Sequence, residues 1–255
     1  MNVARITREL SRRWLATRLA LAGRAHQYPE IMALRRFFEA FEVDALIDVG
    51  ANAGQYARQA RRDAGYAGHI FSFEPNPDVF AVLERAAAGD AKWHVFNMAL
   101  SDFDGIVPFN IMAANQFSSI ARPAEQLDPI FAERNKVERV VDMQCRRLDG
   151  MLNELLRPHD LKRPFLKMDT QGHDKAVCEG AGARLADMIG VQSELAVRPQ
   201  YEGASDWREM IAYMEARGFA PNAMFANNKG HFPLLVEMDG LFLRADLANE
   251  GAISA

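Results

Sequence analysis

The sequence contains few cysteines, no long hydrophobic run and no excess of basic residues. Its two cysteines, Cys145 and Cys178, are too few for a disulfide framework, and a chain of 255 residues can bury a core without one. No stretch reaches the roughly 18 consecutive apolar residues of a membrane span. Because Arg18 interrupts the longest apolar run near the N-terminus, we infer no secretory signal and expect a cytoplasmic protein. The net charge of −4 excludes a generally basic binder of nucleic acid.

The composition that remains is that of a globular protein with an uneven distribution of charge. Hydrophobic residues make up 49% of the chain and charged residues 25%, which are ordinary proportions for a folded domain. Residues 1–36 hold eight arginines and two glutamates, a balance of +6, which leaves −10 for residues 37–255 of a chain whose net charge is −4. We therefore expect a basic, helical N-terminal extension, residues 1–42, followed by one domain, residues 43–255.

The extension has the pattern of an amphipathic helix, with apolar residues on one face and arginines opposite. The apolar face comprises Val3, Ile6, Leu10, Trp14 and Leu21. We favour packing of this face on its own domain or on a second subunit of a homodimer. The alternative is peripheral contact of residues 1–24 with an anionic membrane surface.

Short apolar runs alternate with helical segments along the rest of the chain. We expect buried parallel strands at residues 45–50, 69–74, 93–98, 164–169 and 190–197. This alternation predicts a doubly wound α/β sheet with right-handed crossovers. The last two strands are separated by only a short loop, so they should form an antiparallel hairpin at the end of the sheet.

An insertion of about residues 104–160 interrupts this alternation. It should contain strands at residues 106–111 and 137–145, a polar loop at residues 113–119 and a helix at residues 148–156. A segment of this kind between two halves of a sheet is well placed to shape a binding pocket.

Polar residues close several of the apolar runs, among them Asp48, Glu74, Asp169 and Glu194. In open α/β sheets a ligand binds outside the carboxyl ends of the strands, where such side chains would meet. Burying them without partners would cost free energy, so they need a function or a partner.

The loop after the first strand has the spacing G-x-x-x-G, formed by Gly50 and Gly54 and preceded by Asp48. It is not the dinucleotide loop G-x-G-x-x-G, and an acid here suits a ligand with a cationic amino-acid portion rather than a pyrophosphate. Glu74 can accept hydrogen bonds from both hydroxyls of a ribose, and Asp102 lies where an adenine would rest.

Residues 46–55, 73–77, 99–102 and 165–172 resemble, in order and spacing, the FkbM family of S-adenosylmethionine-dependent methyltransferases. The resemblance covers about residues 43–245 and leaves the basic extension outside. It implies a class I methyltransferase fold, which is a Rossmann-like, seven-stranded sheet with the last strand antiparallel. S-adenosyl-L-methionine would be the cofactor, and the activity would be that of an S-adenosylmethionine-dependent methyltransferase.

The resemblance also implies roles for individual residues. Side chains and backbone of the first loop would surround the methionine part of the cofactor, Glu74 would hold the ribose, and two residues after the third strand would border the adenine. The implied cofactor-binding residues are Asp48, Gly50, Asn52, Gly54, Glu74, Ser101 and Asp102.

Family acceptors include hydroxyls of sugars, glycolipids and secondary metabolites, so we expect O-methylation of a small-molecule or glycan acceptor. The candidates for the base that takes the hydroxyl proton are, in order, Asp169, His173 and Glu194. The insertion and the extension would shape the acceptor pocket. Many family members carry a glutamate where this chain has Gln171, which argues against a role that needs a carboxylate at that position.

Two other functions stay open. One is a non-catalytic S-adenosylmethionine-binding or membrane-associated scaffold protein. The other is a nicotinamide oxidoreductase, which the missing G-x-G-x-x-G loop and the missing Tyr-x-x-x-Lys pair disfavour. The histidines other than His173 have no metal-ligand spacing. Asp169, Glu194 and Asp239 offer oxygen ligands, but acids at strand ends more often form hydrogen bonds, so we expect no metal site.

Overall fold

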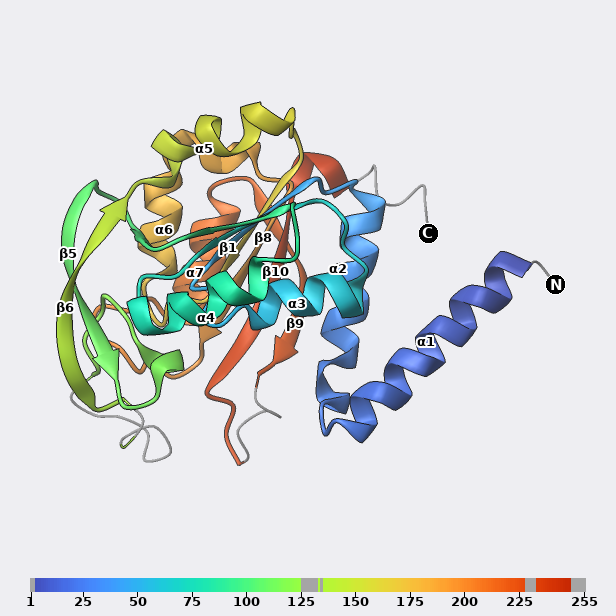
Figure 1. Ribbon diagram of the computed structural model, residues 1–255, viewed down its shortest axis with the longest axis horizontal. Helices are drawn as coiled ribbons and strands as arrows, with labels where there is room; N and C mark the ends of the chain where they lie inside the picture. Colours follow the sequence, from blue (N-terminus) through green and yellow to red (C-terminus); the bar gives the residue numbers. More distant parts are fainter. Residues whose placement is uncertain (1–2, 125–132, 134, 228–232, 249–255) are drawn as a thin grey trace.

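The computed structural model describes residues 3–124, 133, 135–227 and 233–248. Its centre is a seven-stranded sheet in the order β3-β2-β1-β7-β8-β10-β9 (Figure 1). The strands are β1 (Ala45–Val49), β2 (His69–Phe73), β3 (Trp93–Phe96), β7 (Pro164–Met168), β8 (Gly190–Ala196), β9 (Phe219–Ala226) and β10 (Glu237–Arg244). β10 runs antiparallel to both of its neighbours, and β1, β2, β3, β7 and β8 pair in parallel. This is the fold class that the sequence predicts, including the antiparallel last strand.

The order of the strands places the polar strand ends together. β1 and β7 lie next to each other at the centre and are buried along their whole length, as expected for parallel strands covered on both faces. The chain moves outward from β1 to β2 and β3, returns to β7 and then continues to β8 on the other side. The carboxyl ends of β1 and β7 therefore flank the point where strand order reverses, which is where open α/β sheets bind ligands.

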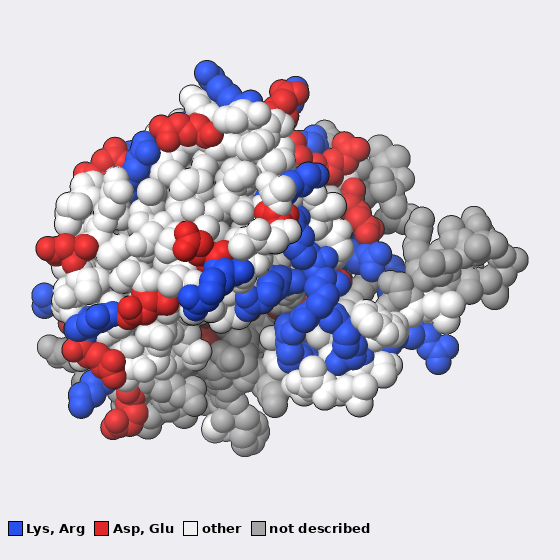
Figure 2. All heavy atoms as spheres, in the orientation of Figure 1, with Lys and Arg blue, Asp and Glu red and all other residues white. Residues whose placement is uncertain are grey.

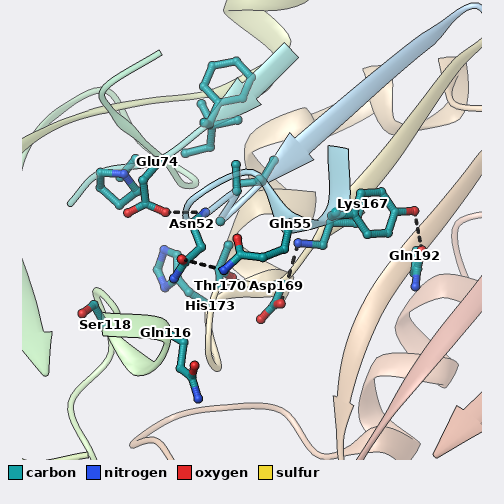
Figure 3. A pocket seen from close by; sticks show the side chains of 18 of the residues that line it. Asn52, Gln55, Glu74, Gln116, Ser118, Lys167, Asp169, Thr170, His173 and Gln192 are labelled. Atoms are coloured by element: carbon teal, nitrogen blue, oxygen red, sulfur yellow. Dashed lines mark hydrogen bonds and ion pairs between the residues drawn. The ribbon is translucent and has the colours of Figure 1, made fainter. Parts of the chain in front are cut away.

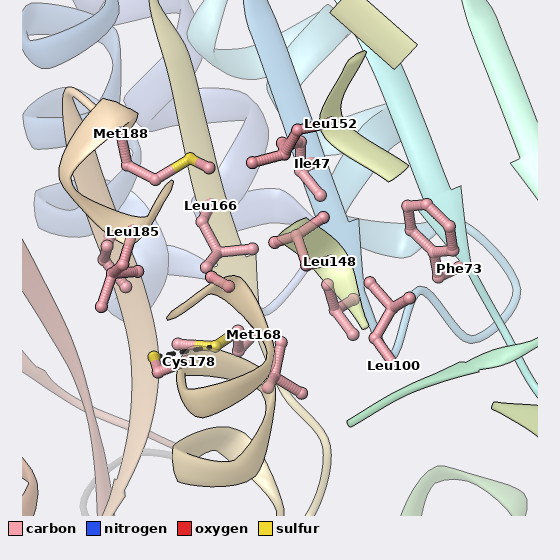
Figure 4. Packing of buried hydrophobic residues seen from close by; sticks show 14 of the residues in the cluster. Ile47, Phe73, Leu100, Leu148, Leu152, Leu166, Met168, Cys178, Leu185 and Met188 are labelled. Atoms are coloured by element: carbon pink, nitrogen blue, oxygen red, sulfur yellow. Dashed lines mark hydrogen bonds between the residues drawn. The ribbon is translucent and has the colours of Figure 1, made fainter. Parts of the chain in front are cut away.

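Helices cover both faces of the sheet. One face carries α5 (Leu148–Leu156), α6 (Asp174–Ala181) and α7 (Trp207–Glu215), which pack on a core of leucine, methionine and phenylalanine side chains (Figure 4). The other face carries α2 (Tyr28–Ala40), α3 (Gln55–Gln59) and α4 (Pro77–Ala87). In each of these layers the apolar side of the helices is buried, which supplies most of the favourable free energy of the fold.

The insertion forms a second sheet at one side of the molecule, with order β4-β6-β5 (Figure 1). β5 (Gly105–Met112) and β6 (Val137–Arg146) are the two strands that the sequence predicts there, and α5 is the predicted helix. The expected third strand of the main sheet is shorter than predicted. β3 ends at Phe96, and β4 (Ala99–Leu100) already pairs with β6 in the second sheet.

The N-terminal extension is helical, as predicted, but its buried face is not the predicted one. α1 (Val3–Leu21) leaves Leu10, Trp14 and Leu21 60%, 63% and 87% exposed. Leu15 and Leu19 are buried instead, in the same core cluster as α2. The described side chains of α1 that pack on the body are in its C-terminal half (Figure 1), where the i, i+4 pair Leu15 and Leu19 makes the contact. The side chains of Val3 and Ile6, which belong to the predicted face, lie outside the described residues. No described helix is long and apolar enough to cross a membrane.

Candidate functional site

A cavity of about 290 Å³ opens at the carboxyl ends of β1 and β7. Its walls come from the loop after β1, the end of β2, the first turn of α2 and a loop of the insertion. The insertion contributes Asn115, Gln116 and Ser118, and the extension contributes Gln27 and Glu30. Both segments that the sequence analysis expects to shape the pocket therefore line it.

The loop after β1 is held in a tight, left-handed conformation. Gly50, Asn52 and Gly54 have φ angles of 74°, 49° and 80°. A Cβ atom on Gly50 would lie 2.0 Å from the backbone oxygen of Asp169, so only glycine fits beside the end of β7. The backbone amides of Gly50 and Ala51 both donate to the carbonyl of Phe73, at 3.0 and 2.9 Å, which ties the loop to β2.

Glu74 follows β2 and is buried against this loop (Figure 3). Its carboxylate accepts hydrogen bonds from the backbone amides of Asn52 and Asn76, each at 2.8 Å. Burial raises the pKa of Glu74 to about 7, although these two bonds lower it in part. The Asn97 side chain donates to the backbone carbonyl of Glu74 at 2.8 Å and so fixes the strand end. Glu74 is thus oriented before any ligand binds.

A buried ion-pair network forms the floor of the cavity. Lys167 Nζ lies 3.3 Å from Asp48 Oδ1. It also lies 3.7 Å from Asp169 Oδ2 (Figure 3). Burial lowers the pKa of Lys167, but the two carboxylates raise it more, so the net shift is upward and the lysine is charged. Asp48 is fully buried and does not line the cavity, whereas Lys167 and Asp169 do. The charge of Asp48 reaches a ligand only through Lys167.

A second chain of contacts connects the extension to the sheet. The hydroxyl of Tyr56 donates to Gln192 Oε1 at 2.6 Å, and Gln192 Nε2 donates to Glu30 Oε1 at 2.8 Å. Tyr56 also lies under Lys167, with Nζ 5.1 Å from the ring centroid. Glu30, Tyr56 and Gln192 all line the cavity, but the sequence analysis did not identify them. They belong to three distant segments, and no local motif marks them.

Gln171 connects two of the predicted catalytic acids. Its side-chain amide donates to Asp169 Oδ1 at 2.7 Å and to Glu194 Oε2 at 2.9 Å, and its own oxygen lies 3.0 Å from the hydroxyl of Tyr201. The amide supplies one N–H donor to each carboxylate, which a glutamate side chain could not do when ionised, so the glutamine at this position has a structural reason. Glu194 stands behind Gln171 and does not line the cavity. Burial raises the pKa of Glu194, and the negative charge of the neighbouring Asp169 raises it further.

His173 lies in the wall at the start of α6. Its Nε2 atom is 2.8 Å from the hydroxyl oxygen of Ser101, and that hydroxyl donates to Asp102 Oδ1 at 2.9 Å. In the tautomer in which the Ser101 proton is directed to Asp102, Nε2 donates to Ser101 and Nδ1 keeps a lone pair. Burial lowers the pKa of His173, with Asp102 opposing, so the ring is neutral at pH 7. Ser101 and Asp102 hold His173 from behind and do not line the cavity.

The structure thus separates the ten predicted site residues into two groups. Five line one cavity, and these are Gly50, Asn52, Glu74, Asp169 and His173. The other five stand behind its wall, and these are Asp48, Gly54, Ser101, Asp102 and Glu194. Asp239, which the sequence analysis considers only as a metal ligand, also lines the cavity, at the start of β10.

Comparison with known proteins gives a consistent result. The family model described as the methyltransferase FkbM domain matches residues 48–221. The hexuronic acid methyltransferase AglP of Haloferax volcanii is 29% identical over 145 residues, which are 56% of this chain and 52% of that protein. The chain therefore spans about half the length of this relative.

Among solved structures, methyltransferase FkbM from Methylobacillus flagellatus KT superposes with a TM-score of 0.50 and 13% sequence identity. The match covers 79% of this chain and 44% of that one. Magnesium protoporphyrin IX methyltransferase of Synechocystis PCC 6803 superposes over 87% of this chain and 81% of that one, with a TM-score of 0.45 and 8% identity. At 13% identity the superposition with the FkbM structure shows a similar fold and nothing more. A similar fold is consistent with the sheet described above.

Proposed function

Because the chain belongs to the methyltransferase FkbM family, we propose that it transfers a methyl group from S-adenosyl-L-methionine to a hydroxyl of a sugar or glycan. The observation that carries this proposal is the arrangement of Glu74, the loop of Gly50 and Asn52, and Asp169 around a single cavity at the point where strand order reverses. Methyl transfer needs an in-line approach to the sulfonium methyl, so the protein mainly has to align two ligands.

The cofactor half of the cavity would be formed by Glu74 and the loop after β1. Both Glu74 oxygens already accept one backbone amide each, and their remaining lone pairs can accept the two ribose hydroxyls. The methionine portion would lie along Gly50 and Asn52, with Asp169, which Lys167 holds in place, available for its positive charge. Asp48 supports this half by fixing Lys167 from below.

Asp169 is our first candidate for the base that takes the acceptor proton. Its side chain is 42% exposed, faces the cavity and is held by Lys167 and Gln171. His173 is the second candidate, since its ring is neutral and Nδ1 keeps a lone pair. Glu194 remains the third candidate. It does not line the cavity, and in this proposal it acts on the site by holding Gln171.

The charge of the acceptor half favours a neutral acceptor. Glu30, Asp169 and Asp239 line it, and Lys167 is already shared by two carboxylates. Burial raises the pKa of Glu30 and of Asp239, so a further anion here would meet groups that are already costly to ionise. AglP is named for a hexuronic acid. We propose that the present chain prefers a neutral sugar over a uronic acid.

Two measurements test these proposals in order. Calorimetry should show S-adenosylmethionine or its demethylated product binding to the protein, with NAD inert; binding of NAD alone would exclude a methyltransferase. Transfer of a labelled methyl group should then be compared between a neutral glycoside and the matching uronide. A preference for the uronide would overturn the acceptor proposal and leave the methyltransferase proposal intact.

Residues 1–42 are, in this proposal, a helical extension that completes the domain of residues 43–255 rather than a separate unit. Glu30 and Gln27 complete the cavity, and Leu15 and Leu19 attach α1 to the body. The exposed Trp14 and Leu21 are available for a contact outside this chain. Sedimentation and liposome binding of the chain without residues 1–14 would separate a homodimer contact from a membrane contact.

A further inference from the structure

Three histidines meet at the end of the sheet opposite to the cavity. His69 is the first residue of β2, and His94 is the second residue of the neighbouring strand β3. His159 ends the short helix η4 (Arg157–His159), which follows α5. These residues are 25 and 65 positions apart in the sequence, so no spacing indicated a common site. The parallel order of β2 and β3 and the return of the chain after α5 bring them together.

The geometry of the cluster is close to that of a set of metal ligands. One ring nitrogen from each histidine lies within 4.8 Å of the other two. His69 Nδ1 and His94 Nε2 are 3.2 Å apart, and their rings are nearly coplanar, with an interplanar angle of 2°. In a tetrahedral site with metal–nitrogen bonds of about 2.0–2.1 Å, neighbouring nitrogens are separated by about 3.3–3.4 Å. The two strand histidines share a hydrogen bond at about the separation of two ligands, so a metal that binds both nitrogens must displace the proton between them.

The third ring lies over the other two. The centroid of His159 is 4.1 Å from that of His69 and 5.1 Å from that of His94, with interplanar angles of 29° and 30°. A metal must lie near the plane of each ring that binds it, so binding requires ring rotations of the histidines. His159 is exposed and is free to make such a rotation, and its exposure leaves a side of the site open to water.

The surroundings of the cluster carry charges of both signs. Neutral imidazole is the form that binds metals. The positive charges of Lys92 and Arg61 lie near His69. The charge of Arg61 is balanced by Asp90, with which it forms an ion pair at 2.7 Å. A set of three imidazoles suits Zn²⁺ and similar transition metals rather than Mg²⁺ or Ca²⁺, which prefer oxygen ligands.

We propose that His69, His94 and His159 bind one divalent transition-metal ion, with Zn²⁺ as the fitting ion and water as the fourth ligand. The ion would tie η4, and through it the end of α5, to the edge strands β2 and β3. Because the cluster lies at the opposite end of the strands from the cavity, this site is structural and separate from methyl transfer.

The test uses the full chain without a polyhistidine tag, stripped of metal, in a calorimetric titration with Zn²⁺. One ion per chain should bind, Co²⁺ should give the visible absorption of a tetrahedral site, and Zn²⁺ should raise the unfolding temperature. His159→Ala should weaken Zn²⁺ binding at least about tenfold, since even the loss of an outer partner of a ligand costs 10–100-fold. His159 is exposed, so this change spares the fold.

His26→Ala is the matched control, because His26 is an exposed histidine on another short helix, η1 (Ala25–Gln27). It should bind Zn²⁺ as the unchanged chain does. A second variant, His94→Ala, should lose the Co²⁺ spectrum and keep the binding of S-adenosylmethionine. Absence of stoichiometric Zn²⁺ binding, or equal affinity in His159→Ala and His26→Ala, would overturn the proposal.

Discussion

The two halves of the cavity are built in different ways. The cofactor half consists of short contiguous segments, residues 50–54 and 74–76, whose positions are fixed by backbone hydrogen bonds. The proposed acceptor half combines Glu30 of α2, Asp169 of the loop after β7 and Asp239 of β10. Side-chain bonds hold two of these residues, since Gln171 donates to Asp169 and Gln192 donates to Glu30. Backbone bonds depend little on residue type, whereas side-chain contacts change with each substitution. We therefore expect the geometry of the cofactor half to stay constant when residues are substituted and the geometry of the acceptor half to vary.

The largest effect should come from Asp169, which stands between the two halves. In Asp169→Asn the new oxygen can still accept the bond from Gln171, whereas the basic group and its ion pair with Lys167 are removed. We expect kcat for methyl transfer to fall by about 10²–10⁴-fold, the usual range for loss of a general base. The exposed Asp160→Asn is the control. An unchanged kcat would make Asp169 structural, and His173→Ala would then be the variant to measure.

Glu74 tests the cofactor half alone. Glu74→Ala removes the acceptor that faces the ribose and leaves the amides of Asn52 and Asn76 without their partner. We expect the affinity for S-adenosylmethionine to fall by about 1–3 kcal/mol, the scale of a hydrogen bond to a charged group. Glu84→Ala, on the exposed side of α4, should bind the cofactor normally. An equal loss of acceptor affinity at saturating cofactor would contradict the separation of the halves.

The pH dependence of cofactor binding should sharpen the same separation. The pKa of Glu74 in the unliganded protein is raised to about 7, and only the ionised form has both oxygens free to accept the ribose hydroxyls. The affinity should therefore rise by about tenfold between pH 6 and pH 8 and level off above that. For a carboxylate whose folded pKa lies above its unfolded value, ionisation destabilises the unliganded fold. Stability should decrease as pH rises from the unfolded pKa to about 7, and bound cofactor should reduce this decrease.

Gln171 tests the acceptor half, with the smallest expected effect. Gln171→Glu replaces the amide that donates to Asp169 and Glu194 with a third carboxylate. We expect kcat/KM for the acceptor to fall by about tenfold or less, because only the acceptor half loses its alignment. The affinity for S-adenosylmethionine, measured by calorimetry, should change less than twofold. A larger loss of cofactor affinity would show that the two halves are coupled through Asp169.

The sequence places the residues of the proposed cofactor half at one edge of the sheet because they follow strands directly. A strand end, a glycine pair and an acid are local signals, and the parallel order of β1, β2 and β7 then places them at one edge. The prediction assigned contact with the ligand to Asp48, Ser101 and Asp102, which instead stand one layer behind Lys167 and His173. Spacing along a strand tells which edge a residue reaches, but it does not tell which of two neighbouring side chains faces the cavity.

The acceptor half could not be predicted in the same way. Glu30 and Gln192 are separated by 162 positions and meet only because α2 packs against β8. The helical pattern of α1 was equally incomplete as a guide, since Leu15 and Leu19 rather than Trp14 face the body. In both cases the contact depends on how two elements pack, which is a property of the whole fold.

The bond between Glu30 and Gln192 also sets an order of events during synthesis. Glu30 is translated early, but its partner is made 162 residues later, and Asp239 follows at the start of the last strand. Glu74 and the loop of Gly50 can come together as soon as β2 has left the ribosome, whereas the wall opposite must wait for β8 and β10. A chain stalled between these points would contain every residue of the proposed ribose-facing side and would lack most of the opposite wall.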